Sequence, residues 1–220
     1  MSQTNQQPNV FTAGSHSVGQ LWDADYATPN GLPSTAETGW TEAPGQYPDV
    51  QTHLFAAMSD CGVYPGNGGY VGINGISWVQ VSPSVYPNMV ITHDDTTHVY
   101  AVEAYQGSMW FDYDGSWYGY IPGGAWGCHF PFGDLIQFGG EVATPEYQTC
   151  TDMGNGLFGT QANSATVTDS NYYSVSPYHQ GPTSIQAGYM SDQPQYNVGQ
   201  WAPTPGQQVD AFHYGGPGWC

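Results

Sequence analysis

The chain has 220 residues, no lysine, no arginine and a formal net charge of −18 at pH 7. Nucleic-acid binding depends on Lys and Arg that neutralise phosphates, and binding to anionic membranes depends on the same side chains. The composition therefore excludes a basic nucleic-acid surface and argues against a membrane-surface protein. The apolar runs are also much shorter than the roughly 20 residues of a membrane-spanning helix.

The missing cations fit a protein that works in acid. Most carboxylates are neutral below about pH 3.5, so only the seven His and the amino terminus would then carry charge. An ordinary chain rich in Lys and Arg would repel itself strongly under these conditions. A chain without them also offers no cleavage site to proteases that require Lys or Arg. We therefore expect a secreted, extracellular protein in an acidic environment.

Segments rich in Tyr, Trp, Val and Thr alternate with Gly- and Pro-rich turns such as "YPGNGG" and "DYDGS", which is typical of an all-β protein. The pattern predicts a two-sheet β-sandwich in a single domain, residues 1–220. It shows no convincing helix, and "FGDLIQF" at 132–138 is the one short candidate. The expected strands are 16–22, 36–42, 50–58, 69–81, 97–106, 108–113, 117–121, 136–143, 147–152, 163–168, 184–190 and 207–214.

Cysteine spacing indicates one or two disulfides among Cys61, Cys128, Cys150 and Cys220. No Cys-x-x-Cys pair or Cys/His cluster is present, so we expect no zinc site. Four cysteines allow three pairings, and the sequence alone does not choose between them. We favour Cys128–Cys150, which would bracket Glu141, and this leaves Cys61–Cys220.

The histidines show no metal-ligand spacing. Asp94 and Asp95, near His93 and His98, could suggest a metal site, but a polar hairpin turn explains them better. We expect neither a metal nor a cofactor.

Two glutamates stand beside glycines in expected strands. The chain has only five Glu, and Glu141 follows a Gly pair in "IQFGGEVATP", residues 136–145. Glu37 lies two residues before Gly39 in "AETGWTE". Glycine inside a strand often marks a place where a ligand comes close. Each glutamate alone could be a solvated carboxylate, but together they could converge across a concave sheet.

Eight segments extend this observation along the chain. "AETGW" at 36–40 is similar to a Val-Glu-Ala-Gly-Trp motif and "FGGEV" at 138–142 to a Trp-Gly-Gly-Glu-Val motif. The other six are "HSVGQLW", "QTHLFAAM", "WVQVSP", "MWFDYDGSWYGYIP", "TCTDMGNGLF" and "FHYGGPG". Each is weak alone, but in this order they resemble the neprosin family of glutamic peptidases over nearly the whole chain.

The resemblance implies an antiparallel β-sandwich with a cleft across one curved sheet. It also implies an acid-active endopeptidase that favours cutting after proline and is made with a pro-segment. The catalytic glutamates of the family fall on Glu37 and Glu141. Substrates would be proteins or peptides, particularly proline-rich ones, and we expect a monomer. The chain departs from the family pattern at Ile121, where Trp is usual, and at Cys128 and Cys150, which have no obvious counterpart.

Two carboxylates that share one proton could hydrolyse a peptide bond. Close like charges do not both ionise easily, so one pKa rises and the other falls. We expect Glu141 to be the general base and Glu37 the acid that donates to the oxyanion, although the opposite assignment stays open.

A pocket for proline would need aromatic residues. Any single aromatic could instead belong to the core, because aromatic side chains dominate β cores. The candidates are Trp22, Trp40, Trp78, Tyr120 and Tyr214, with Gln80 as a polar helper.

Two other functions fit the same residues. A glycosidase could use both carboxylates on a β-sandwich. A non-catalytic carbohydrate-binding sandwich would use exposed aromatic residues and would tolerate loss of both glutamates. A serine hydrolase of the Gly-x-Ser-x-Gly type has no support, because that motif is missing from the sequence.

Overall fold

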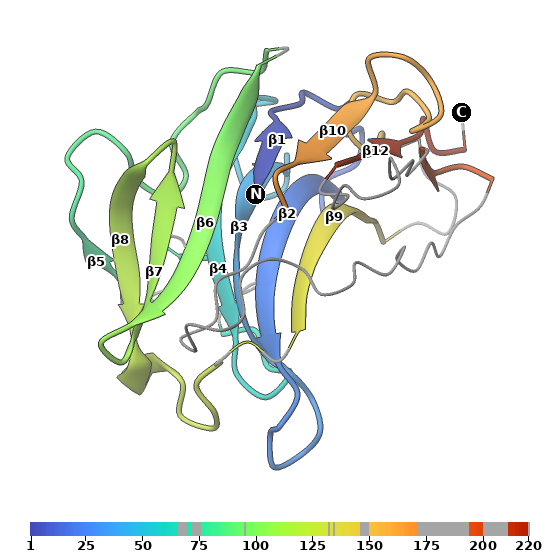
Figure 1. The fold of residues 1–220 in the computed structure, drawn as a ribbon. Coiled ribbons are helices and arrows are strands. Elements are labelled where there is room, and N and C mark those ends of the chain that lie inside the picture. The colour runs from blue at the N-terminus through green and yellow to red at the C-terminus, as the bar shows by residue number, and fades with distance from the viewer. Residues whose placement is uncertain are drawn as a thin grey trace, which may run out of the picture.

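The computed structural model describes residues 1–65, 70–71, 76–94, 96–131, 133, 135–145, 150–170, 194–199 and 211–219. Within these residues the chain forms two antiparallel sheets and a 3₁₀ turn, Gly123–Ala125 (Figure 1). The expected all-β, two-sheet sandwich is confirmed. In the described part of the chain, no helix is long and apolar enough to cross a membrane.

The larger sheet has eight strands in the order β11-β12-β10-β1-β6-β7-β8-β5. Hairpin turns at Gln106-Gly107 and Asp114-Gly115 connect β6, β7 and β8. Both residues of each turn have positive φ, and this matches the right-handed twist of the flanking strands. The bounds are β1 Ser2–Thr4, β5 Val79–Gln80, β6 Thr97–Tyr105, β7 Ser108–Tyr113, β8 Ser116–Pro122, β10 Ala165–Thr168, β11 Asn197–Val198 and β12 Phe212–Gly215.

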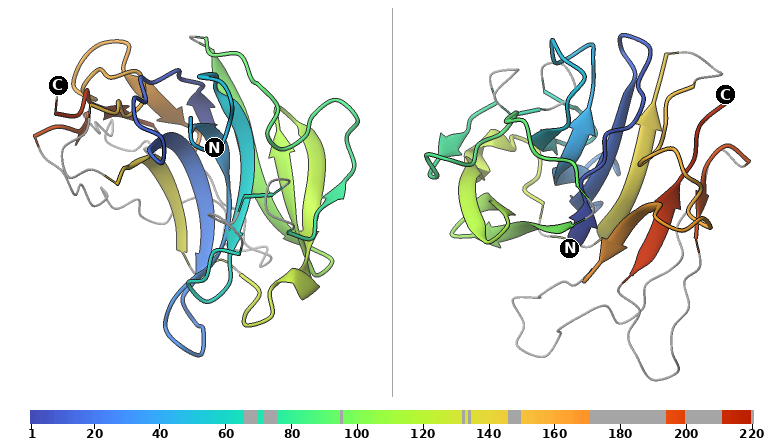
Figure 2. Two further views of the ribbon diagram at one scale, coloured as in Figure 1. Left: turned by 180° about the vertical axis from the view of Figure 1, so that it is seen from behind. Right: turned by 90° about the horizontal axis from the view of Figure 1, so that it is seen from above.

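The smaller sheet has four long strands in the order β4-β3-β2-β9. They are β2 (His16–Asp25), β3 (Ser34–Glu42), β4 (His53–Ser59) and β9 (Leu135–Ala143). Both further views show these strands curving together beside the larger sheet (Figure 2). Strand β2 pairs with β3 on one side and with β9 on the other, so it occupies a central position in the sheet.

The core lies between the two sheets. Alternate residues of a strand point to opposite faces, and those that face the larger sheet include Trp40 of β3 and Leu54 of β4. Tyr214 of β12 packs against them so closely that a Cβ on Gly140 would lie 2.3 Å from its ring. Large buried aromatic side chains from the larger sheet complete the core: Tyr100, Phe111, Tyr118 and Phe212.

Most expected strands are present with shifted ends. There are exceptions: among the described residues only Val79–Gln80 of 69–81 forms a strand, and residues 150–152 of the expected strand 147–152 form none. The described part of "FGDLIQF" belongs to β9. The short polar strand β1 was not predicted, because its pairing with β6 and β10 is long-range. The expected strand 184–190 lies outside the described residues, as do parts of 147–152 and 207–214.

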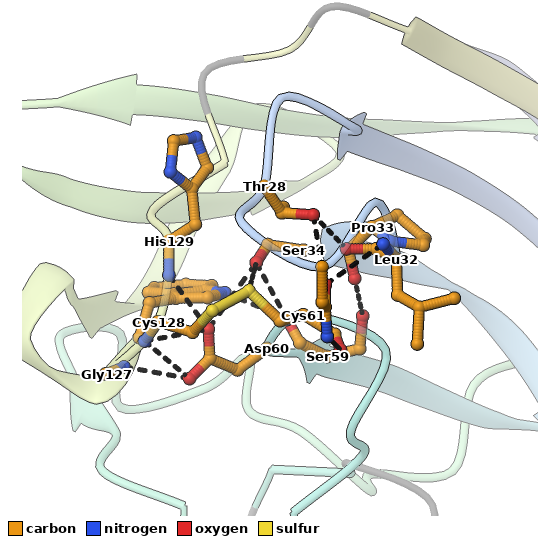
Figure 3. Close-up of a disulfide and its surroundings, with 12 residues drawn as sticks. Thr28, Leu32, Pro33, Ser34, Ser59, Asp60, Cys61, Gly127, Cys128 and His129 are labelled. Atoms are coloured by element: carbon orange, nitrogen blue, oxygen red, sulfur yellow. Dashed lines mark hydrogen bonds between the residues drawn. A yellow bond between two sulfur atoms is a disulfide. The ribbon is translucent and has the colours of Figure 1, made fainter.

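The disulfide joins Cys61, just after β4, to Cys128, beyond β8 (Figure 3). The favoured pairing Cys128–Cys150 was wrong. The Asp60 carboxylate accepts backbone N–H groups from Gly127 at 2.9 Å, Cys128 at 2.9 Å and His129 at 3.1 Å. These bonds bring the two segments together, a constraint that Cys spacing does not reveal. Cys150 is also disulfide-bonded, and Cys220 lies outside the described residues.

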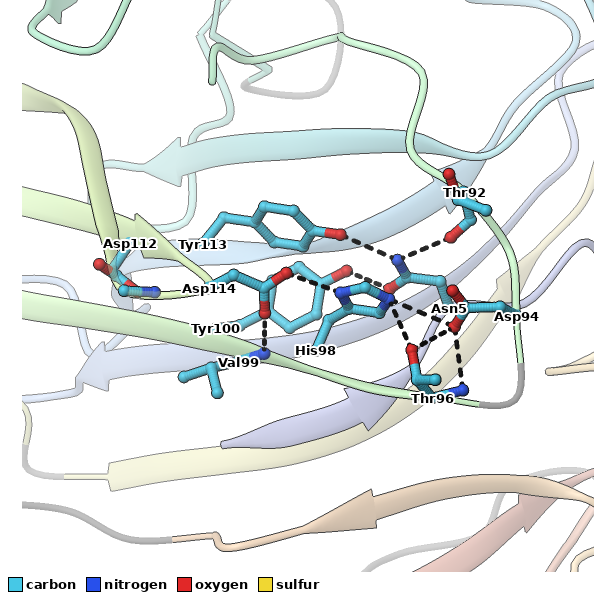
Figure 4. A network of polar contacts seen from close by, with 11 residues as sticks. Asn5, Thr92, Asp94, Thr96, His98, Val99, Tyr100, Asp112, Tyr113 and Asp114 are labelled. Atoms are coloured by element: carbon cyan, nitrogen blue, oxygen red, sulfur yellow. Dashed lines mark hydrogen bonds and ion pairs between the residues drawn. The ribbon is translucent and has the colours of Figure 1, made fainter. Parts of the chain in front are cut away.

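A polar network connects the start of β6 to the loop before it and to the β7–β8 hairpin (Figure 4). His98 Nδ1 lies 2.7 Å from an Asp114 carboxylate oxygen, and its Nε2 lies 3.3 Å from Asp94. The Asn5 side-chain amide donates to Tyr113 at 3.1 Å and accepts from the Tyr100 hydroxyl. The two carboxylates approach opposite ring nitrogens of His98, so this cluster ties a loop to a hairpin.

Candidate active site

The face of the smaller sheet that points away from the core carries both predicted glutamates; we call it the site face. Residues directly opposite each other in antiparallel strands share a face. The register pairs Trp22 of β2 with Glu37 of β3, and Val18 of β2 with Glu141 of β9. Since Trp22 and Val18 are both even-numbered residues of β2, Glu37 and Glu141 lie on the same face, on either side of β2.

Gln20 lies between the two glutamates. It is opposite Gly39 on β3 and Gly139 on β9, so no neighbouring side chain flanks it in its row. A Cβ on Gly139 would meet no atom within 4 Å. The space above Gly139 is therefore open, and a ligand could approach the backbone there.

Glu37 is buried, with 7% of its surface exposed. The Thr35 hydroxyl donates to its Oε1 at 2.6 Å, and the Tyr64 hydroxyl donates to the same atom at 3.2 Å. Burial raises the pKa of Glu37, and the negative charge of Glu141 raises it further, while the two hydroxyls oppose the shift. Glu37 is thus suited to hold a proton in acid.

Glu141 has a different environment, since its side chain is 49% exposed. The Gln20 amide donates from Nε2 to Glu141 Oε2 at 3.1 Å, and His16 Nε2 lies 3.6 Å from Oε1. The site therefore combines a buried glutamate with a solvated one that contacts an amide and an imidazole.

The contrast between the glutamates arises mainly from burial. Their strands are separated by β2, so the two backbones lie about 10 Å apart across the sheet. They are also offset by four residues along β2, and no hydrogen bond joins the two carboxylates, which are both described. We expected the two carboxylates to share one proton directly. In the structure, each carboxylate instead has its own set of hydrogen-bond partners.

An apolar cluster borders the site face on the β4 side. Phe55 of β4 packs against Tyr70 with ring centroids 5.4 Å apart, and Val18 and Ala57 belong to the same cluster. On the other side of Gln20 along β2, the half-buried ring of Trp22 lies opposite Glu37. Of the five aromatic residues considered from sequence, Trp22 shares the face of the glutamates.

The other four aromatic residues lie elsewhere. Trp40 and Tyr214, with 0% and 1% exposed surface, occupy the core face of the smaller sheet or pack against it. Trp78, just before β5, packs on Phe111 of β7 at 5.6 Å, and Tyr120 of β8 stacks on Trp110 of β7 at 4.5 Å.

Gln80 is also distant from the site face. Its amide donates to the backbone oxygens of Val85 and Tyr118 and thereby holds a loop against β8. The structure does not bring Gln80, Trp78, Tyr120, Trp40 or Tyr214 to Glu37 and Glu141, so we do not retain them as substrate contacts.

Four residues that contact the glutamates were not predicted from the sequence: Gln20, His16, Thr35 and Tyr64. A signal existed for two of them. In the stretch "HSVGQLW", His16 and Gln20 are even-numbered with Trp22, and the two-residue period of a strand places them on one face. Thr35 is likewise two residues from Glu37. Tyr64 reaches the site from the segment after β4, which no local pattern indicates.

Comparison with known families matches the Neprosin family over residues 13–217. The match covers nearly the whole chain, so the protein belongs to the Neprosin family, and the predicted resemblance is confirmed. Comparison with individual curated proteins finds no match. Family membership supports a peptidase function.

Proposed function

We propose that the protein is a secreted, acid-active glutamic endopeptidase that cleaves preferentially after proline. The observation that carries the proposal is that a buried Glu37 and a solvated Glu141 share one face of the smaller sheet. Enzymes that run acid and base chemistry together place two titratable groups in environments that separate their pKa values. Family membership and the motif positions of both glutamates support the same assignment.

In the proposed reaction, a water molecule lies between the glutamates with the substrate peptide group. Glu141 takes a proton from water as general base, and the water oxygen attacks the carbonyl carbon. Protonated Glu37 donates a hydrogen bond to the oxygen as it becomes negative. When the C–N bond breaks, Glu141 passes its proton to the leaving nitrogen. Both glutamates then return to their starting states, and no cofactor takes part.

Trp22 supports the preference for proline. Its half-buried ring stands on the site face opposite Glu37, where an apolar ring of the substrate could pack against it. Two features support the proposed compartment: a disulfide between Cys61 and Cys128, which is typical of oxidising compartments, and a chain without Lys or Arg.

The test is digestion of a proline-rich protein by the purified protein at pH 3–4, with cleavage sites mapped by mass spectrometry. We expect cuts after proline, and no cuts with Glu141→Gln. A panel of polysaccharides incubated in parallel tests the glycosidase alternative. Folded wild-type protein that cleaves no peptide bond between pH 2 and 7 would exclude the peptidase, whereas cuts without regard to proline would exclude only the preference.

A further inference from the structure

Glu141 is contacted by two side chains of the same strand. His16 and Gln20 are four residues apart on β2 and lie on the site face, and Glu141 is opposite Val18, midway between them. His16 Nε2 approaches one carboxylate oxygen at 3.6 Å, and Gln20 Nε2 donates to the other at 3.1 Å. Each oxygen of Glu141 thus has its own partner.

The position of His16 matters because cations are scarce in this chain. With no Lys or Arg, its only basic side chains are seven His. The other described ion pairs all join a His to an Asp, as His98 does with Asp94 and Asp114. His16 instead lies beside a glutamate of the candidate active site, and histidine is ordinarily charged in the acid range where this site is proposed to work.

Gln20 differs from His16 because it is nearly buried, with 4% of its surface exposed. Its partners in the row are Gly39 and Gly139, so neither β3 nor β9 places a side chain directly beside it. One amide N–H holds Glu141, and the amide carries a second N–H. A neutral amide cannot set the charge of Glu141, but it can fix the direction of the carboxylate.

We propose that His16 and Gln20 are positioning residues of the catalytic centre: the His16 imidazolium keeps Glu141 ionised in acid, and the Gln20 amide aims its carboxylate at the attacking water. This inference rests on the proposed peptidase function. The titratable groups on the site face near His16 are Glu141 of β9, Glu37 of β3, His53 of β4, and the Tyr64 and Tyr70 phenols after β4. Both phenols are neutral in acid. His53 pairs with Asp49 at 3.5 Å, so His16 is the histidine that contacts Glu141.

The sign of the His16 effect follows from its charge. A cation favours the ionised form of a neighbouring carboxylate, so removing it raises the pH at which Glu141 takes up a proton. The acid limb of the pH–rate profile, where activity falls as the base is protonated, then moves upward.

The first test measures kcat/KM from pH 2 to 7 for the wild type, His16→Gln and His98→Gln. His98 is the matched control because it also pairs with carboxylates but lies at the end of the larger sheet. We expect the acid limb to move upward in His16→Gln and to coincide with the wild type in His98→Gln. An acid limb of folded His16→Gln that coincides with the wild type would overturn the role of His16.

A second measurement needs no peptidase activity. Coupling between two groups is reciprocal, so loss of the Glu141 charge must make His16 release its proton more easily. We expect the NMR titration midpoint of His16 to fall in Glu141→Gln relative to wild type, while that of His98 stays. An unchanged His16 midpoint would refute the ion pair even if the protein proved to be no peptidase. A lower midpoint in an inactive protein would reject the function alone.

The Gln20 role is tested with Gln20→Met, which keeps side-chain length and removes the amide, against Gln51→Met at an exposed site. We expect kcat to fall tenfold or more, because misplacement of a reacting group by about 1 Å can cost about a hundredfold. KM and the acid limb should change little. Retention of kcat within twofold would refute the role. If Gln20→Met does not fold, the wild-type Gln20 amide NMR signals decide: they must titrate together with Glu141.

Discussion

The two faces of the smaller sheet use glycine for opposite purposes. On the core face, Gly140 makes room for the Tyr214 ring, and Gly19 makes room for Trp40 and Tyr214. On the site face, Gly139 has open space above it beside Gln20. Gly139 and Gly140 are adjacent in sequence, yet one is required by packing and the other leaves access to the backbone. Adjacent residues of a strand can therefore belong to the core and to a functional site.

The two glutamates differ in a comparable way. Glu37 is buried and accepts two hydroxyl donors, whereas Glu141 is half exposed and contacts an amide and an imidazole. In the absence of Lys and Arg, burial, hydroxyl groups and histidine are the means by which this site can separate an acid from a base.

The largest effect is expected from the glutamates. Glu141→Gln and Glu37→Gln should each fold, and each should lower kcat/KM at least about a hundredfold, the usual scale for an acid–base group. Glu37→Gln should retain more activity than Glu141→Gln, because an amide can still donate to the oxyanion. Glu103→Gln is the control, since Glu103 is exposed on β6. Near-full activity of either site variant in a peptide assay at pH 4 would contradict the assignment.

The glycines should separate stability from activity. In Gly140→Ala the new methyl group would lie 2.3 Å from the Tyr214 ring, and such overpacking costs about 1–3 kcal/mol. Gly139→Ala meets no neighbour, so its melting temperature should stay within about 2 °C of wild type, while a methyl group in the open space should lower kcat/KM. Thermal melts and peptide assays of both variants check this. Equal melting temperatures would show that the core contact is not tight.

Much of the fold was predictable because strands, turns and the two-residue period are local features. The hairpins at Gln106-Gly107 and Asp114-Gly115 follow from such signals. The Cys61–Cys128 pairing was not predictable, because it depends on the Asp60 contacts with a segment 67 to 69 residues away.

The candidate site was predictable in part. The motifs place both glutamates, but they do not say which aromatic residue shares their face. Trp40 is an even-numbered residue of β3 and points to the core, whereas the odd-numbered Glu37 points to the site face. The two-residue period of a strand would have shown that these two side chains lie on opposite faces. Tyr64 could not, because it comes from a loop.

The smallest effect concerns Glu42, at the end of β3. It is buried, with 2% of its surface exposed, and its Oε2 has no hydrogen-bond partner among the described residues. Burial, aided by the charges of Asp49 and Asp152, raises the pKa of Glu42 to about 7 from an ordinary value of 4.5. Burial also raises the pKa of Glu37 and Asp112.

A raised folded-state pKa means that the folded protein binds the proton more tightly than the unfolded chain. The stabilisation is complete below the unfolded value, about 4.5, and is lost as pH rises through about 7. Three groups oppose this trend: burial lowers the pKa of His53 and of the amino terminus, and the Thr96 hydroxyl lowers the pKa of Asp94. The self-repulsion of a chain with a formal charge of −18 and no Lys or Arg also weakens as its carboxylates take up protons, which adds to the effect of Glu37, Glu42 and Asp112. We expect a higher wild-type melting temperature at pH 4 than at pH 8.

Glu42→Gln, which removes the buried charge, should be more stable than wild type at pH 8 by about 1–2 kcal/mol and nearly equal at pH 4. Melts of both proteins from pH 3 to 8 at fixed ionic strength measure this. A variant that melts below wild type at pH 8 would show that Glu42 is stabilised as a carboxylate.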